Sequence, residues 1–213
     1  MAVLTFPSLT PTNAEFGQLS NTQSFTSPLS GTTQTLEMPG AHWHLKMAFG
    51  GLSDAERRLL QAFLAQCRGQ AGRFYYGDPA FLINGPSGSI PGTPLIDGAA
   101  QSGTTLNTKG WTPSQSNILK AGDYFHYTNG SSGREMHMVV ADANSDGSGL
   151  SALSIEPAIR VAPDDAAAIT VTNAMCQMRL VDNSQSSWGL GLGLAGGVGT
   201  IAIEAVEAFT DAA

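Results

Sequence analysis

Residues 42–49, HWHLKMAF, alternate between large apolar side chains and polar or small ones. Successive side chains of a β-strand point to opposite faces of a sheet, so this alternation predicts a strand with one buried face. Gly50 and Gly51 end the pattern. Any fold of this chain must therefore place a sheet here and cover one of its faces. The inward set is Trp43, Leu45, Met47 and Phe49, and the outward set is His42, His44, Lys46 and Ala48.

A helix is predicted directly after this strand, over residues 53–68. Ser53 and Glu56 have the spacing of a capping box, in which each side chain accepts a hydrogen bond from the other residue's backbone amide. Gly69 suits the left-handed residue that ends many helices. The apolar stripe expected to face the sheet consists of Leu59, Leu60, Phe63, Leu64 and Cys67. The opposite, polar face carries Arg57, Arg58, Gln61 and Gln66.

The other apolar runs are short and are separated by Gly, Pro, Asn and Ser, which is typical of strands joined by turns. Between residues 80 and 120 the pattern is weak and indicates an extended surface excursion with short strands only. The sequence therefore predicts a mainly β fold: a tube-like barrel or sandwich with one flanking helix, plus an inserted second β-domain. Strands are expected within 4–9, 23–29, 33–38, 73–76, 95–100, 104–108, 119–130, 136–142, 150–159, 167–181 and 201–209.

Charged residues make up only 13% of the 213 residues, about half of the roughly 25% typical of globular domains. So few charges indicate either a surface that neighbouring subunits or partners largely cover, which we favour, or one that hydroxyl and amide groups keep soluble. The net charge of −7 argues against a protein that holds nucleic acid by neutralising phosphates. The first basic residue is Lys46, so we expect no export signal and synthesis in the cytoplasm. The longest uncharged run, 183–203, contains six glycines, so we expect no membrane insertion.

Sequence motifs give no catalytic, cofactor or metal site, and we expect a protein that is not an enzyme. Gly191, Gly193 and Gly196 spell a dinucleotide fingerprint, but too little chain follows for the required βαβ unit. Residues 142–147 resemble half of a calcium loop, although the twelfth position is Leu153 rather than Glu. We interpret them as a polar hairpin turn.

His42 and His44 share one face of the predicted strand, and a zinc hydrolase built on them is one alternative. No cysteine or carboxylate near them in sequence completes a tetrahedral set, so we expect a pair that is structural or faces a neighbouring subunit instead. Trp111, Tyr124 and Tyr127 surround the long excursion. We expect alternate rings to pack in the core, with Tyr124 and Tyr127 partly exposed. Exposed rings could instead stack on sugars, so a carbohydrate-binding β-module that contacts a host-surface glycan is a second alternative.

Several segments together resemble distal tail or minor tail proteins of long non-contractile-tailed bacteriophages. They are NTQSFTSPLSGTTQTLEMPGAHWHLKMAF, FLAQCRGQAGRFYYGDP, LKAGDYF, VVADANSDGSG and LSIEPAIR. The resemblance implies a structural virion protein of the tail tip or baseplate: a homo-oligomeric, hexameric ring between tail tube and tail-tip hub. It implies contacts with tail tube, tape-measure and hub proteins, and a channel that DNA crosses only transiently. It supplies no catalytic residues and no cofactor.

The resemblance also divides the chain. Residues 1–76, with the helix 53–68, match the ring-forming β-domain, 77–172 correspond to the inserted β-domain, and 173–213 are expected to return to the ring. The polar face of the helix is where we expect contacts between subunits. The predicted interface residues are Arg57, Arg58, Gln61, His42 and His44.

Overall fold

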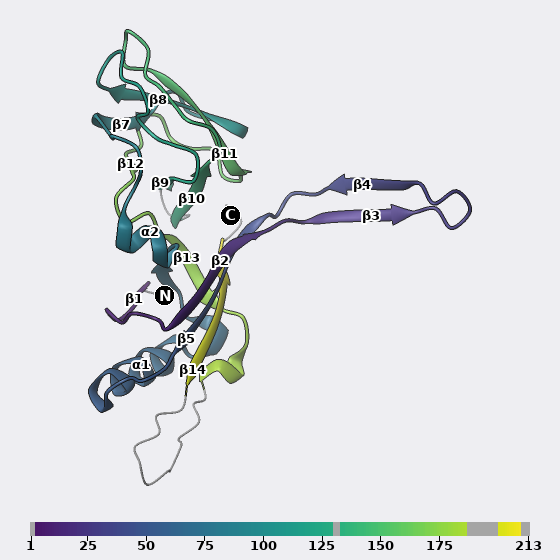
Figure 1. Ribbon diagram of the computed structural model, residues 1–213, viewed down its shortest axis with the longest axis vertical. Coiled ribbons are helices and arrows are strands. Elements are labelled where there is room, and N and C mark those ends of the chain that lie inside the picture. Colours follow the sequence, from purple (N-terminus) through teal and green to yellow (C-terminus); the bar gives the residue numbers. More distant parts are fainter. Residues whose placement is uncertain (1–2, 130–132, 187–199, 210–213) are drawn as a thin grey trace.

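The protein, described by a computed structural model over residues 3–129, 133–186 and 200–209, is mainly β (Figure 1). Two six-stranded sheets lie one above the other, a helix flanks the lower sheet, and a two-stranded arm projects sideways. The predicted fold class, a β-barrel-like protein with one flanking helix and a second β-domain, is confirmed. No helix among the described residues is both long and apolar enough to cross a membrane.

The first sheet has the strand order β1-β6-β13-β14-β5-β2. The alternating segment forms β5, which lies between β14 and β2 and runs antiparallel to both. β1 and β2 are the two edges of this sheet. The strand bounds are β1 Leu4–Thr5, β2 Asn13–Leu19, β5 His42–Phe49, β6 Phe74–Tyr76, β13 Cys176–Leu180 and β14 Ile201–Glu207.

Helix α1, Asp54–Cys67, covers one face of the first sheet, and its predicted capping box is present. The ring of Phe63 meets that of Phe74 on β6 edge to face, with 5.2 Å between centroids. Leu60, Leu64 and Cys67 are also buried. The prediction that Leu59 faces inward is wrong, because 58% of its surface is exposed. One residue turns a helix by about 100°, and Leu60 holds the inward position.

The second sheet has the order β12-β9-β10-β11-β8-β7, and its two edge strands nearly close it into a barrel. Leu95 and Ala168 form an antiparallel bridge between these edges, and the amide of Ile96 donates to the carbonyl of Ala167 at 3.0 Å. The predicted hairpin over 136–159 is present as the antiparallel pair β10 and β11. The bounds are β7 Gly92–Ile96, β8 Gly103–Trp111, β9 Tyr124–Asn129, β10 Gly133–Val139, β11 Ser151–Ile159 and β12 Ile169–Thr170.

Three short helical elements lie between the strands. Helix α2, Pro79–Asn84, follows the first sheet, and the carboxylate of Asp78 caps it by accepting from the amides of Ala80 and Phe81. Pro79 occupies the first helical position, where no hydrogen bond from its nitrogen is needed. A 3₁₀ turn, η1 Gly69–Ala71, links α1 to β6. A second one, η2 Asn183–Ser186, follows β13.

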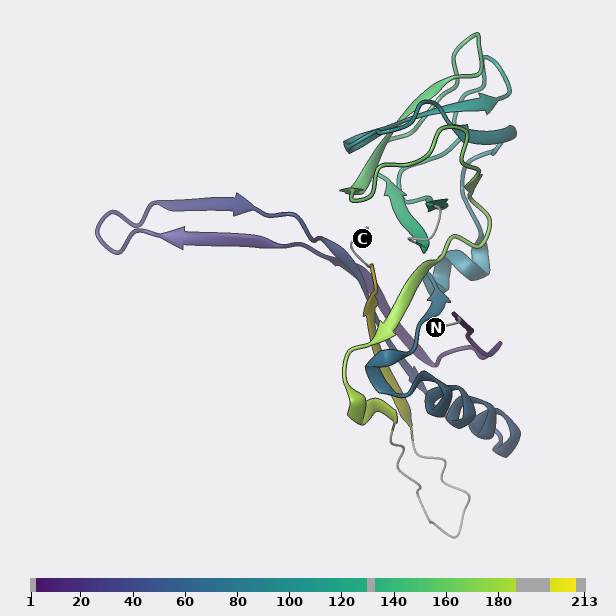
Figure 2. The same cartoon turned by 180° about the vertical axis from the view of Figure 1, so that it is seen from behind.

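The arm consists of β3, Thr22–Thr26, β4, Thr33–Glu37, and the turn between them. β3 and β4 pair only with each other among the described strands. The arm extends the β2–β5 pair away from the body, and both Figure 1 and the view from behind in Figure 2 show it standing clear of the two sheets.

Candidate assembly surfaces

The arm has two chemically different faces. Residues paired across an antiparallel ladder share a face, and the register pairs Gln23 with Leu36 and Phe25 with Gln34. This apolar face, defined by Phe25 and Leu36, leaves the two side chains 67% and 63% exposed. The other face presents hydroxyl groups and the only charged residue of the arm: Thr22, Ser24, Thr26, Thr33, Thr35 and Glu37.

The tip of the arm, residues 27–32, is a compact turn with an apolar end. The amide of Ser27 donates to the carbonyl of Thr32 at 2.8 Å, and the amide of Gly31 donates to the carbonyl of Ser27 at 2.9 Å. Gly31 has φ of +69°, a conformation that suits glycine. Leu29 is 99% exposed at this end. A large apolar side chain is therefore exposed to water on a turn that backbone hydrogen bonds stabilise.

Polar contacts join the two strands of the arm at its root, where they continue the β2–β5 pair. The side-chain amide of Asn21 donates to the carbonyl of Pro39 at 2.7 Å, and the amide of Met38 donates to the carbonyl of Asn21 at 2.8 Å. Leu19 still pairs with His42 in the first sheet. These bonds make the arm a continuation of the sheet with a defined direction.

The predicted interface residues of α1 have unequal environments. Arg57 donates to the carboxylate of Asp54 at 3.0 Å, and this hydrogen bond lowers the pKa of Asp54. Arg57 and Gln61 are half-buried, whereas Arg58 is exposed beside the exposed Leu59. The exposed surface of α1 is thus centred on Arg58 and Leu59. It is rotated about the helix axis, away from Arg57 and Gln61 of the predicted polar face. Its role in contacts between subunits stays a prediction.

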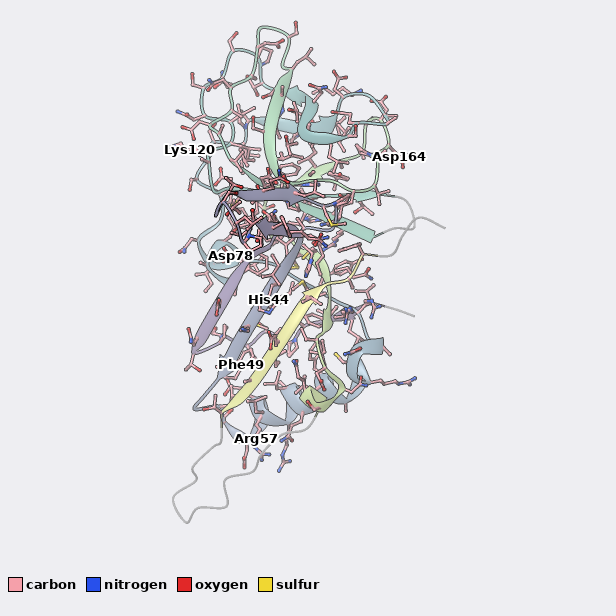
Figure 3. The ribbon with its side chains drawn as sticks, turned by 90° about the vertical axis from the view of Figure 1, so that its right-hand side faces the viewer. His44, Phe49, Arg57, Asp78, Lys120 and Asp164 are labelled. Carbon is pink, nitrogen blue, oxygen red and sulfur yellow. The ribbon has the colours of Figure 1, made fainter. Side chains whose placement is uncertain are left out.

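His42 and His44 lie on the face of β5 opposite α1, as expected, but each has its own partner. The Nε2 atom of His44 lies 2.8 Å from the Glu204 carboxylate on β14, and its hydrogen bond lowers the pKa of Glu204. The Nδ1 atom of His42 lies 2.9 Å from the carbonyl of Gly40. No group of three His, Cys, Asp or Glu residues in the described ranges could hold a metal ion. Figure 3 shows His44 on the first sheet, away from Arg57 on the helix.

A buried ionic cluster, which consists of Glu135, Arg160 and Glu207, joins the two sheets. The sequence patterns did not predict it. The guanidinium of Arg160 donates to Glu207 of β14 at 2.5 Å and to the carbonyl of Ala41 at 2.9 Å. Its Nε atom lies 3.8 Å from Glu135 of β10, whose carboxylate accepts from the amide of Arg160 at 2.7 Å. Burial raises the pKa of both carboxyl groups.

The neighbours of this cluster are also buried and polar. Burial lowers the pKa of His137 to about 3, so the ring is neutral at pH 7. Its Nδ1 atom lies 2.7 Å from the carbonyl of Pro157, and its Nε2 atom lies 3.2 Å from the hydroxyl of Tyr127. The indole of Trp43 on β5 donates to the carbonyl of Met136 on β10 at 2.8 Å. These contacts attach the second sheet to the first at one defined position.

The three aromatic residues considered for sugar stacking do not have the exposed ring faces that this role requires. Trp111 is 3% exposed, and Tyr127 is fully buried inside the second sheet. Tyr124 packs edge to face on Phe16 and Trp43, at 6.0 and 5.5 Å between centroids, where the two sheets meet. A ring that stacks on a sugar must present its face to solvent, and these rings serve the two cores instead.

No protein-family model matches this chain, and no curated protein matches it. The motifs quoted above and the geometry of the described residues therefore carry the functional proposal.

The calcium-like loop is a structural turn, as interpreted. Asp146 accepts from the amides of Ser148 and Leu150, both at 2.8 Å, and the side-chain oxygens of Asp142 and Asn144 also accept from backbone amides. Asp146 thus shapes the turn itself, and Asp142 and Asn144 tie it to the amides of Ala121 and Asn117. The glycine fingerprint at 191–196 lies outside the described residues.

Proposed function

We propose that this protein is a structural, non-enzymatic virion component of a phage tail tip. Copies of the chain assemble into a six-membered ring that joins the tail tube to the tail-tip hub and leaves a channel for DNA. Tail tube, tape-measure and hub proteins are its further partners. The observation that carries the proposal is the arm, whose apolar face and tip project into solvent away from the two sheets.

An arm of this kind needs a covering surface. A two-stranded hairpin alone is at best marginally stable in water, and its uncovered edges invite pairing with other chains. A large exposed apolar surface on a soluble protein marks an interaction site. Phe25, Leu29 and Leu36 supply that surface on one narrow element. Burial of the arm against another chain would explain why it exposes these side chains. The low content of charged residues supports extensive burial between subunits.

The second support is the face of the first sheet opposite α1. Glu15, Lys46 and Glu204 lie side by side across β2, β5 and β14 in the register of the sheet. The sum of these three charges is −1. The neighbouring side chains on this face include His44, Ala48, Ala202 and Val206, none of which is a lysine or arginine. Tight DNA binding needs clustered cations that neutralise phosphates. A wall of this composition suits a water-filled passage that DNA crosses without being held.

A dilution series followed by native mass measurement tests the proposal. The wild-type chain is expected to populate a multiple of its 22.1 kDa mass, with six copies the largest closed species. Leu36→Ser should shift the population toward monomers, because it removes apolar area from the arm. Thr35→Ser, on the opposite face, should leave the distribution unchanged. A wild-type chain that is monomeric at every concentration, with or without tail tube protein, would overturn the proposal.

A further inference from the structure

An apolar cavity lies at the edge of the first sheet away from the arm. It has a volume of about 490 Å³ and lies between β1, the segment after it, β6 and α2. Ile83 of α2 is 71% exposed at its rim. The side chains that give the cavity its apolar character are Phe6, Leu9, Leu82, Ile83 and Met175.

The cavity carries one positive charge. The guanidinium of Arg134 lies 4.1 Å from the centroid of the Tyr75 ring, and both residues line the cavity. No Asp or Glu is among the described residues that line it. The arm has no Lys or Arg and one carboxylate, Glu37. A docked arm therefore meets no like charge, and Arg134 can donate to the carbonyl groups of a turn.

The arm and the cavity have the geometry of a head-to-tail contact. The arm leaves the sheet from the β2–β5 edge, and the cavity borders β1 and β6 at the opposite edge. Figures 1 and 2 show the arm and α2 on opposite sides of the molecule. The tip of the arm cannot reach the cavity of its own chain across the body. Contacts between two different surfaces of identical chains generate rings when the rotation closes.

The area of the arm is sufficient for such a contact. At about two thirds of the extended-chain value, an arm of this length exposes roughly 1,700 Å². A neighbour that covers half of it removes roughly 800 Å² from water, which is what each partner contributes to an interface of standard size. One arm per chain thus provides the area that a stable contact between two copies needs.

We infer that the tip of the arm, with Leu29 at its end, seats in the β1–α2 cavity of the next copy of this chain. The inference rests on the proposed ring and specifies the surfaces that build it. Each copy donates one arm and accepts one, so every apolar tip and every cavity in a closed ring is filled. An open chain of copies leaves one tip and one cavity unfilled, which favours closure.

Cross-linking between two single-cysteine variants tests the inference. Leu29→Cys and Ile83→Cys are purified separately, mixed, and treated with a short bismaleimide. The native Cys67 and Cys176 are fully buried and do not compete. The mixture should give a covalent dimer of the two variants, and the double variant should give a ladder of higher species. Leu29→Cys mixed with Leu59→Cys is the matched control, since Leu59 is exposed on α1 away from the cavity.

The outcomes separate the inference from the proposed function. Cross-linking at position 83 at least tenfold above the position 59 control supports the tip in the cavity. Equal or absent cross-linking, in a chain whose native mass is oligomeric, overturns this docking and leaves the ring intact. A wild-type chain without oligomers overturns both. Leu29→Ser provides a second measurement. Docking predicts weaker assembly, with a melting temperature equal to that of the wild type at a dilution where both are monomeric; unaltered assembly contradicts docking.

Discussion

The buried cluster between the two sheets offers a quantitative test of how they are joined. Replacing Arg160 by Met keeps an unbranched side chain of similar length and removes its positive charge. The side chain is 14% exposed, and its partners Glu135 and Glu207 are 7% and 2% exposed. In the variant, the two carboxylates remain in the interior without a cation.

The expected loss of stability follows from the geometry. At 3.8 Å and an effective dielectric constant of 20, one ion pair contributes on the order of 4 kcal/mol, and desolvation offsets part of it. Removing one partner of a buried pair costs about 3–5 kcal/mol because the other charge is left uncompensated. We therefore expect Arg160→Met to lower the free energy of unfolding by about 3–5 kcal/mol at pH 7. Arg58→Met, at an exposed site, should change it by less than about 0.5 kcal/mol.

The loss should depend on pH with a defined sign. Burial raises the pKa of Glu135 and of Glu207 above the ordinary value of 4.5. Between pH 4.5 and the raised pKa values, the folded state therefore binds more protons than the unfolded state. The free energy of unfolding falls as the pH rises through that window. Removing Arg160 raises both pKa values further and widens the window. The variant should accordingly recover most of its loss near pH 4.5, relative to the wild type.

Urea unfolding at a series of pH values measures this dependence. Arg160→Met combined with Glu207→Gln should be more stable at pH 7 than Arg160→Met alone, since one uncompensated charge is gone. A loss below about 1 kcal/mol at pH 7, or a loss that is the same at pH 4.5 and pH 7, would show that the cluster does not hold the sheets together as described.

Three further predictions concern the helix, the thiols and the arm. Phe63→Ala should lower the free energy of unfolding by about 3–5 kcal/mol and Leu59→Ala by much less, and the reverse order would contradict the observed helix phase. Burial raises the pKa of Cys67 to about 11, so its thiol should react with a maleimide at pH 8 only after unfolding; fast labelling of the folded chain would refute its burial. Phe25→Ser should weaken self-association about tenfold or more, as analytical ultracentrifugation would detect. At a dilution where wild type and variant are both monomeric, the two melting temperatures should agree within about 1 °C, because the side chain touches neither core; a lower melting temperature there would place it in the fold.

Local sequence signals predicted the regular elements that their own residues determine. The alternation of β5 and the capping box of α1 are contained in a few adjacent residues, and both appear where expected. β2 was missed because NAEFGQL alternates weakly and depends on pairing with β5. Leu59 was misplaced because five apolar positions make a stripe wider than the buried one. The packing of Phe63 against Phe6 and Phe74 fixes the helix rotation.

The buried ionic cluster between the two sheets and the pairing of the arm both depend on contacts between residues that are distant in sequence. Glu135, Arg160 and Glu207 are separated by 25 and 47 positions, and each alone resembles a surface charge. Short strands at 23–29 and 33–38 were predicted, but no local feature indicates that they pair outside either sheet. The aromatic residues suggested a sugar site because sequence gives no burial. Trp111 donates to the Thr108 hydroxyl within the second core, which only the folded register reveals.

Negative-stain imaging of the purified protein, with class averages at increasing concentration, tests the central claim most directly. The account predicts closed rings with six-fold symmetry and a central hole, which Leu29→Ser and Leu36→Ser together reduce to single particles of normal fold. Uniform single particles in the wild type at all concentrations, or rings that form equally well in the arm variant, would contradict it.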